Sequence, residues 1–286
     1  MMPNKSQHIP VNTLPAGTRK GIMIGRTSFN GLPNAKEVEQ SHRDNGHLFI
    51  LQEKGSTHIE IDFQKHVIEA SSVIYIHPNQ VHRLIAFENA TISNWIITAE
   101  NLRPEYLKLL EDLTPVDVLP LKAETLSTIS KAASLCIELS ERKHEKLYDS
   151  ILKESCNILV ALITSQYLTH YKSTDTYSRF EVITRAFKTS LEYNFTTVKS
   201  PAEYAKSLNI STPYLNECIK TTTGYSVSHH IQQRIILEAK RLLYHSNKSV
   251  KEIAGELGYD DYSYFTRLFV KILGITPLAF RSKNLV

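Results

Sequence analysis

Residues 249–281 read SVKEIAGELGYDDYSYFTRLFVKILGITPLAFR, and this stretch decides the fold of the C-terminal part of the chain. Ser249, with a glutamate three residues later, predicts a helix start, because such a pair satisfies orphan backbone amides reciprocally. We expect Asp260 to cap a second helix over about 261–272, which Gly274 ends in the left-handed conformation. Two short helices joined by a tight turn indicate a helix-turn-helix unit.

The same pattern occurs once earlier in the chain. Ser200 and Pro201 begin it with a second predicted capping box and a proline at the first helical position, and Ser211 is the expected N-cap of a helix over about 212–222. The two copies are offset by 49 residues before the turn and by 50 after it. The matched pairs are Tyr204 and Ile253, Ala205 and Ala254, Leu208 and Leu257, Ile210 and Tyr259, Leu215 and Phe265, Ile219 and Phe269, Gly224 and Gly274, and Ser226 and Thr276. The slip falls between the helices, where an insertion costs little.

A long uninterrupted helix is expected between the copies, over 226–245, because this segment has a helical period and no helix breaker. It would span roughly 30 Å at about 1.5 Å per residue. One turn of B-DNA is about 34 Å long, so two units joined in this way could enter successive major grooves. The alternative is a plain helical bundle with chance self-similarity, which the matched caps, alanines and glycines disfavour.

Residues 258–281, together with 249–254, closely resemble the signature of the AraC-type (arabinose-regulator) transcription factors, and the resemblance extends over 180–283. More loosely, His42-Arg43-Asp44, Gly55, Asp62 and the run 78–82 resemble the small cupin barrel that carries the sensor in many members. The resemblance implies a regulator that binds double-stranded DNA near promoters, usually as a homodimer, and often answers to a small-molecule effector. Activation by recruiting RNA polymerase is implied by the resemblance alone, and repression stays open.

Composition agrees with a protein of two domains and 286 residues, of which 42% are hydrophobic and 22% charged. No apolar run approaches the length of a membrane span, and residues 1–20 form a polar tail without a signal-peptide core, so we expect a cytoplasmic protein. Residues 181–286 hold 14 Lys and Arg against 9 Asp and Glu, which favours an anionic partner. The three scattered cysteines predict no disulfide and no metal site.

The expected fold class is α+β with two domains. Residues 21–100 are predicted to form a cupin-like β-barrel or sandwich of short strands, separated at 53–55, 78–79 and 88–89. The predicted strands are 48–51, 58–61, 72–76 and 92–97.

Residues 101–172 are predicted to form a helical connector, and residues 173–177 a linker to an all-α DNA-binding domain over 178–286. Within that domain, the first unit covers about 200–224 and the second about 249–274. The connector carries an apolar stripe, which packs either on its own barrel or on a second subunit. The stripe consists of Leu147, Ile151, Ile158, Leu159, Leu162 and Ile163.

Base-reading candidates are the outward positions on the second helix of each unit. Arg267 suits guanine and Asn216 suits adenine, although a phosphate contact is an equally good interpretation of Arg267 and a better one of Lys220. Glu217 departs from the resemblance. Its carboxylate would repel phosphate, although it can accept a hydrogen bond from a cytosine amino group. Phe265, Phe269 and Arg281 are expected to be structural. The full candidate set is Thr212, Pro213, Asn216, Glu217, Lys220, Tyr262, Ser263, Tyr264, Thr266 and Arg267.

The N-terminal domain offers candidate effector contacts, although core packing is the alternative for each aromatic residue. They are His42, Arg43, Tyr75, His82 and Trp95. No metal and no other cofactor is expected. Counted from His42, position 44 carries no second histidine and no glutamate follows at cupin spacing, and His47 falls on the opposite strand face. Counted from His47, Glu53 fits the spacing, but Phe49 takes the place of the second histidine.

The chain is therefore predicted to be a regulator, with activation favoured, and not an enzyme. Two other functions stay open at this point. One is a metal-dependent cupin enzyme with a helical appendage, which stoichiometric iron or manganese with turnover would indicate. The other is a ligand-independent architectural DNA binder, which would discriminate weakly between sequences.

Overall fold

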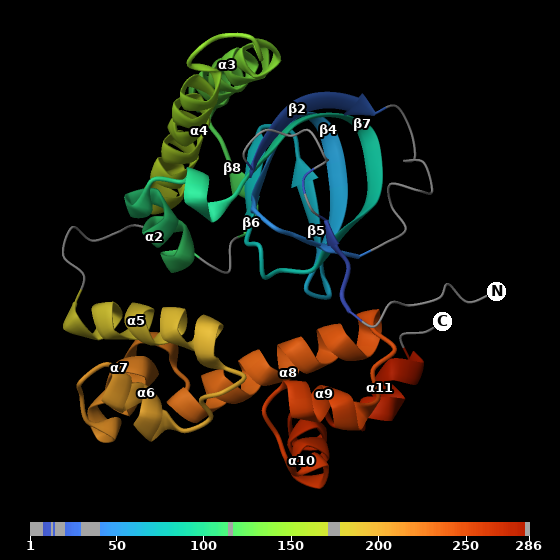
Figure 1. The fold of residues 1–286 in the computed structure, drawn as a ribbon, viewed down its shortest axis with the longest axis vertical. Coiled ribbons are helices and arrows are strands. Elements are labelled where there is room, and N and C mark those ends of the chain that lie inside the picture. Colours follow the sequence, from blue (N-terminus) through green and yellow to red (C-terminus); the bar gives the residue numbers. More distant parts are fainter. Residues whose placement is uncertain are drawn as a thin grey trace. The chain divides into compact units, whose positions relative to one another are not determined.

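A computed structural model describes residues 8–12, 14, 21–29, 41–113, 117–170 and 178–283. The chain divides into two compact units, one over residues 10–172 and the other over residues 173–286 together with residues 1–9 (Figure 1). The predicted linker over 173–177 lies outside the described residues, as does most of the predicted tail over 1–20. The described part of that tail includes a short strand, β1 (Val11–Asn12), which pairs in parallel with β3 (Arg43–Asp44).

The N-terminal unit is built on a six-stranded antiparallel sheet. Its strands are β2 (Ile22–Phe29), β4 (His47–Ile61), β5 (Gln64–Glu69), β6 (Ser72–Ile76), β7 (His82–Ile97) and β8 (Leu119–Pro120). The order is β2-β7-β4-β6-β8, with β5 paired to β4. The end strands β2 and β8 do not pair, so the described sheet is not the closed barrel that the sequence predicts.

Two turns predicted within this sheet are wrong, because each lies inside a long strand. The predicted turn at 53–55 is a pair of register shifts within β4, and the predicted turn at 88–89 lies within β7. Gly55 has a φ of +62°, and a Cβ there would lie 2.1 Å from the carbonyl oxygen of Glu88. The glycine thus permits a bulge where the two strands approach closely, rather than a chain reversal.

The two faces of the sheet pack into separate hydrophobic clusters, as alternation along a strand requires. Phe49 pairs with Tyr75 and Trp95, and these side chains join the cluster formed with the helices. The neighbouring residue Leu48 pairs with Ile76 and Ile96, and these belong to the cluster on the opposite face. Strand register therefore decides which side chains face the helices and which do not.

The α-helices of this unit share the first cluster with the sheet. They are α2 (Pro104–Asp112), α3 (Ala123–Glu141) and α4 (Tyr148–His170), and the 3-10 helix η2 (Ala99–Asn101) precedes them. The predicted apolar stripe on α4 is only partly correct. Leu159 and Ile163 are buried, but Leu147 and Ile158 are 67% and 58% exposed, because the buried face runs through Leu152, Cys156 and Tyr167 instead.

The C-terminal unit is entirely helical in its described residues. Its helices are α5 (Arg179–Asn194), α6 (Pro201–Ser207), α7 (Thr212–Thr223), α8 (Val227–His245), α9 (Val250–Glu256), α10 (Tyr262–Leu273) and α11 (Pro277–Lys283). Helices α6 and α7 lie toward one end of α8, and α9, α10 and α11 lie toward the other (Figure 1).

Most predicted helix ends are confirmed. Ser249 and Glu252 form the capping box, Ser211 caps α7, and Gly224 and Gly274 end α7 and α10 in the left-handed conformation. At the other predicted capping box, Ser200 accepts from the amide of Ala202, and the reciprocal glutamate contact is not formed.

The predicted N-cap of α10 is one residue too early. Asp261 caps this helix through the amides of Ser263 and Tyr264. The turn of the second unit has one residue more than the turn of the first, and this residue precedes the cap. The two caps, Ser211 and Asp261, are therefore 50 residues apart. The two turns share a left-handed residue, with φ of +53° at Asn209 and +78° at Gly258. Asparagine and glycine are the residues that adopt this conformation most readily.

All three cysteines are buried and free, with no disulfide bond between them. The core positions predicted in the helix-turn-helix units are buried as expected, including Ala205, Ala254, Phe265 and Phe269. Within the described ranges, the helices are either too short or too polar to cross a bilayer.

Candidate functional site

The second helix of the first unit, α7, presents a mixed exposed face. Pro213, Glu217 and Lys220 are exposed, and Thr212 is half-buried at the start of the helix. The opposite face, which includes Leu215 and the two residues 218–219, is fully buried. Helical periodicity thus leaves four of the five predicted contact positions of this unit accessible, and an approaching duplex would meet both an acidic and a basic side chain.

Asn216 is the exception among the predicted contact residues of α7. Its side chain is half-buried, and its amide oxygen accepts from the backbone amide of Val227 at 3.3 Å. Its amide nitrogen donates to the carbonyl of Thr212 at 3.2 Å. The amide oxygen therefore holds the start of α8 against α7 and the amide nitrogen bonds within α7, so both polar groups already have partners and a positioning role is a simpler account than the predicted pairing with adenine.

The corresponding face of α10 is richer in hydrogen-bonding and aromatic groups. Tyr262, Ser263, Tyr264 and Arg267 are exposed, and Arg267 is 69% exposed with only a loose ion pair to Asp261 at 3.7 Å. An exposed ion pair of this kind contributes little to stability, so the guanidinium is available to a ligand. Thr266 is half-buried and donates its hydroxyl to the carbonyl of Tyr262.

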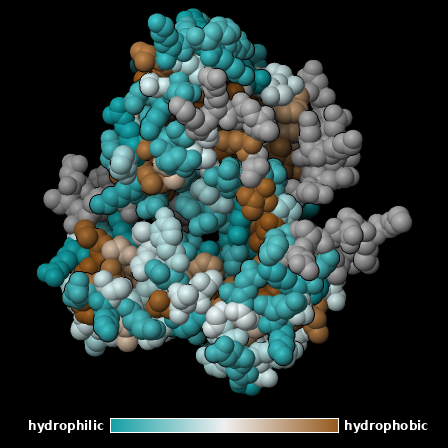
Figure 2. Space-filling view, in the orientation of Figure 1, coloured by the Kyte–Doolittle hydropathy of each residue, from teal (hydrophilic) through white to brown (hydrophobic). Residues whose placement is uncertain are grey.

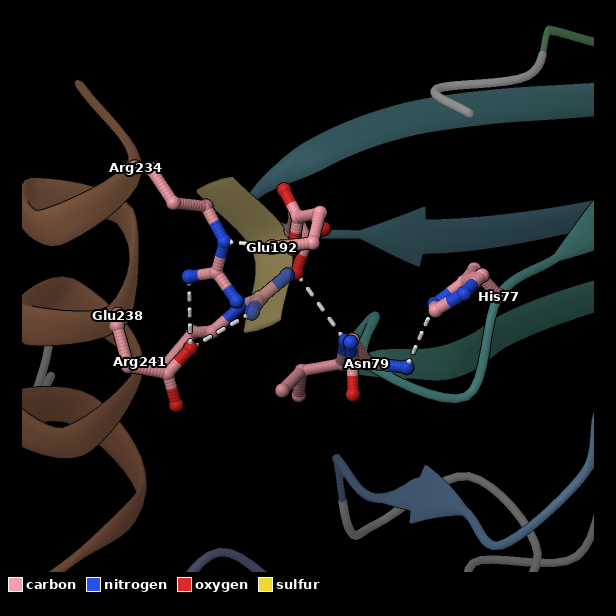
Figure 3. Close-up of polar contacts among 8 residues, drawn as sticks. His77, Asn79, Glu192, Arg234, Glu238 and Arg241 are labelled. Carbon is pink, nitrogen blue, oxygen red and sulfur yellow. Dashed lines mark hydrogen bonds and ion pairs between the residues drawn. The ribbon is translucent and has the colours of Figure 1, made fainter. Parts of the chain in front are cut away.

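Helices α7 and α10, the two candidate recognition helices, both pack on α8. A network of charged side chains fixes α8 to α5. Arg234 donates through Nε to Glu192 of α5 at 2.8 Å and through Nη1 to Glu238 at 3.1 Å (Figure 3). Arg241 donates to the same Glu238 oxygen at 2.8 Å, and the Arg234 guanidinium lies 3.8 Å from the ring centre of Phe195. This network orients α8, the long helix that separates the two helix-turn-helix units.

Arg281 ties the end of the domain to the same helix. Its Nε donates to the carbonyl of Leu243 at 3.1 Å, and an Nη donates to the carbonyl of Lys248. The structural role predicted for this residue is thereby confirmed.

In Figure 2 the part of the surface that belongs to the C-terminal unit is mostly hydrophilic, with scattered hydrophobic residues, as expected of a face that meets water or a polar ligand.

One exposed cation on α10 was not among the predicted contacts. Lys271 is exposed and lies one turn beyond Arg267. Helical spacing of four residues from Arg267 is the signal that would have found it. It adds positive charge to the same face.

The predicted effector residues of the N-terminal unit separate into different places. His42 and His82 lie directly opposite each other, with backbone hydrogen bonds of 3.0 Å in both directions. Asp44, which the sequence analysis did not single out as a ligand, joins them, with 3.4 Å between its Oδ2 and Nε2 of His82. Spacing of two residues from His42 along an extended segment is the signal that places Asp44 on the same face.

Tyr75 and Trp95 do not join this cluster. Both are buried with Phe49 in the core shared with α3 and α4, and the hydroxyl of Tyr75 lies 2.7 Å from Nδ1 of His47. Burial and the nearby His77 lower the pKa of His47 to about 3, so its imidazole is neutral at physiological pH. His47 faces away from the His42 cluster, as predicted, and the structure supports core packing for Tyr75 and Trp95. Arg43, the remaining candidate, is half-buried in β3.

Comparison with known proteins agrees with the geometry of the C-terminal unit. Residues 204–283 match the family model described as a helix-turn-helix domain. The C-terminal unit carries a helix-turn-helix domain. Because the match includes α7, α8 and α10, the repeated helices described above are the elements of this domain.

Two named relatives are transcriptional activators. The HTH-type transcriptional activator Btr of Bacillus subtilis (strain 168) is 28% identical over 224 residues, which cover 77% of this chain but only 41% of Btr. The HTH-type transcriptional activator RhaR of Yersinia pestis bv. Antiqua (strain Angola) is 23% identical over 262 residues, covering 89% of this chain and 88% of RhaR. Among solved structures, ToxT from Vibrio cholerae O395 is 16% identical with a TM-score of 0.43, covering 92% of this chain and 98% of ToxT.

The names of Btr and RhaR and the helix-turn-helix match over 204–283 agree with the resemblance to AraC-type regulators.

Proposed function

We propose that this chain is a sequence-specific DNA-binding regulator of transcription, most simply an activator that acts in the cytoplasm. The observation that carries the proposal is the pair of equal recognition-helix candidates, α7 and α10, each with one buried face and one exposed polar face. Both are held at defined positions along α8. The activator role is supported by the names of the relatives.

The length of α8 fits simultaneous binding of both units to one face of a duplex. Its 19 residues span about 28 Å at 1.5 Å per residue, close to the pitch of B-DNA, about 34 Å. Helices α7 and α10 would then enter successive major grooves. Pro213, Glu217 and Lys220 would face one groove, and Ser263 and Arg267 the other.

Control by a small-molecule effector is the second part of the proposal. The N-terminal unit, with its cupin-like curved sheet, would act as the sensor, and binding would shift the population of DNA-competent chains. His42, Arg43 and His82 are the candidate contacts that belong to neither hydrophobic cluster, although His82 is itself buried. Tyr75 and Trp95 would support the sheet, because their side chains are buried among core residues.

A homodimer would increase affinity, because two linked DNA-binding domains gain from effective concentration. Three exposed apolar side chains support α3 and α4 as the contact region: Leu135 on α3, Leu147 just before α4, and Ile158 on α4. Activation would follow from contact between the DNA-bound dimer and RNA polymerase.

The proposal is tested by measuring the affinity of the full chain for the DNA upstream of its own gene and neighbouring genes, against a random duplex of equal length. Specific binding should exceed random binding by about 10³-fold or more at physiological salt. Removal of an exposed charge from the other unit, by Lys65→Ala on β5, is the control and should leave the affinity unchanged. Equal affinity for all duplexes would instead indicate an architectural DNA binder.

A further inference from the structure

His42, Asp44 and His82 form a compact group of nitrogen and oxygen donors that DNA binding does not use. The Nε2 atom of His42 lies 3.8 Å from Oδ1 of Asp44, and Nε2 of His82 lies 3.4 Å from Oδ2 of the same carboxylate. The two imidazole rings are 4.5 Å apart between centres, at an angle of 62°. One potential ligand atom from each residue lies within 4.8 Å of the other two.

Backbone pairing places these side chains, so the group does not depend on flexible surface residues. The two-way hydrogen bonding between His42 and His82 fixes the histidines opposite each other, and Asp44 continues in β3, which pairs with β1. His82 also begins β7, where it pairs with Ile61, a residue of the second hydrophobic cluster. The donors therefore lie on the face of the sheet that α3 and α4 do not cover.

Burial makes a simple surface ion pair a poor account of this group. His82 is 4% exposed and Asp44 is 6% exposed. Taking a carboxylate out of water costs free energy unless an opposite charge compensates it, and a bound cation would supply that charge.

The donor spacing suits a metal ion. Zinc lies about 2.0–2.2 Å from histidine nitrogen and carboxylate oxygen ligands, so two ligands of one ion are at most about 4.4 Å apart. The nitrogen–oxygen distances of 3.4 and 3.8 Å, each to a different oxygen of Asp44, fall within this limit, and the candidate ligand atoms of all three residues lie within 4.8 Å of one another. Two histidines and one carboxylate form a donor set used by divalent transition metals, with the remaining positions open.

We propose that His42, Asp44 and His82 bind one divalent transition-metal cation of the zinc, cobalt or iron(II) class. The open positions would take water or an oxygen-bearing small molecule. Asp44 would supply the third ligand, so a metal site is proposed where the sequence predicts none. It does not depend on DNA binding.

The test uses the full chain, stripped of metal with a chelator and titrated with Co²⁺ alone. The expected result is one bound Co²⁺ per chain with visible d–d absorption, which Zn²⁺ abolishes by displacement. Asp44→Asn and His82→Gln should each weaken binding by at least about tenfold, since even the loss of an outer-shell partner costs 10–100-fold. His66→Gln, a half-exposed histidine on β5 outside the group, is the matched control and should bind as the wild type does.

Folding of each variant is checked by its thermal unfolding curve without metal. If His82→Gln does not fold, His42→Gln replaces it, because His42 is only half-buried. Absence of a stoichiometric Co²⁺ spectrum in the wild type, or equal binding by the wild type and Asp44→Asn, would overturn the proposal.

Discussion

Glu217 and Arg267 occupy the same position in the two helix-turn-helix units and carry opposite charges. Each is the sixth residue of a helix of 12 residues, which begins after a capping residue and ends at a left-handed glycine. Both side chains are exposed. If the two helices enter the major groove alike, the same place in each half of the binding site meets a carboxylate in one case and a guanidinium in the other.

Replacing Arg267 with alanine is predicted to weaken specific DNA binding and to relax the preference at one base pair by ~1–3 kcal/mol, because a guanidinium pairs bidentately with guanine. The measurement is an affinity series with each base pair of a bound site changed in turn. The salt slope separates the alternative role: a uniform loss of affinity and a slope reduced by about 1 would assign Arg267 to phosphate. An unchanged affinity and slope would remove α10 from the interface.

Replacing Glu217 with glutamine should have the opposite effect on non-specific binding. The carboxylate repels the phosphate backbone, so its loss is expected to tighten binding to random duplexes while discrimination at one cytosine-containing pair decreases. Both quantities can be measured in the same titrations, at two salt concentrations. Equal binding of random DNA by the variant and the wild type would show that Glu217 lies away from the duplex.

Gly258 holds the turn of the second unit against the end of α5. Its φ is +78°, and an added Cβ would lie 1.9 Å from the carbonyl oxygen of Thr196. Gly258→Ala is therefore expected to destabilise the chain by about 1–3 kcal/mol from backbone strain, and by more from the displaced carbonyl. The measurement is the free energy of unfolding in urea.

Gly255, three residues earlier, is the matched control, because an added Cβ there meets nothing within 4 Å. Gly255→Ala in α9 should be neutral or stabilise by up to about 1 kcal/mol, through the higher helix propensity of alanine. Comparable destabilisation by both substitutions would contradict the close approach to Thr196.

His47 is predicted to make stability depend on pH. Burial and the nearby His77 lower its pKa to about 3 in the folded chain, against 6.5 as the ordinary value. Between these values the unfolded chain binds a proton here and the folded chain does not, so stability falls as pH falls below about 6.5. From pH 7 to pH 5, the wild type should lose up to about 2 kcal/mol more than His47→Gln. Parallel stability curves for the two proteins would show that His47 titrates normally.

Local signals explain most of what the sequence predicts correctly in the C-terminal unit. The capping box at Ser249, the cap at Ser211 and the glycines at 224 and 274 act through their own neighbours, so they can be identified without the fold. Asn216 could not be assigned in this way. Its partner is the backbone of Val227, eleven residues away, and only the packing of α7 against α8 brings them together.

The N-terminal unit was harder to predict because its site residues depend on strand register. The bulges in β4 shift the alternation of side chains, so residues on one strand cannot be assigned to a face by counting from a distant position. Tyr75 and Trp95 therefore share a core with α3 and α4, whereas His82 lies on the other face with Asp44. The offset of the stripe on α4 has a related cause, since contact with the sheet decides which side of an apolar helix is buried.

Selection of bound sites from a random duplex library by the full chain tests whether α7 and α10 read DNA together. Two short sequence blocks whose centres lie about 10 base pairs apart should be enriched. Arg267→Ala should relax one block and Glu217→Gln the other. Recovery of no preferred sequence, or of two blocks that neither substitution alters, would contradict the account.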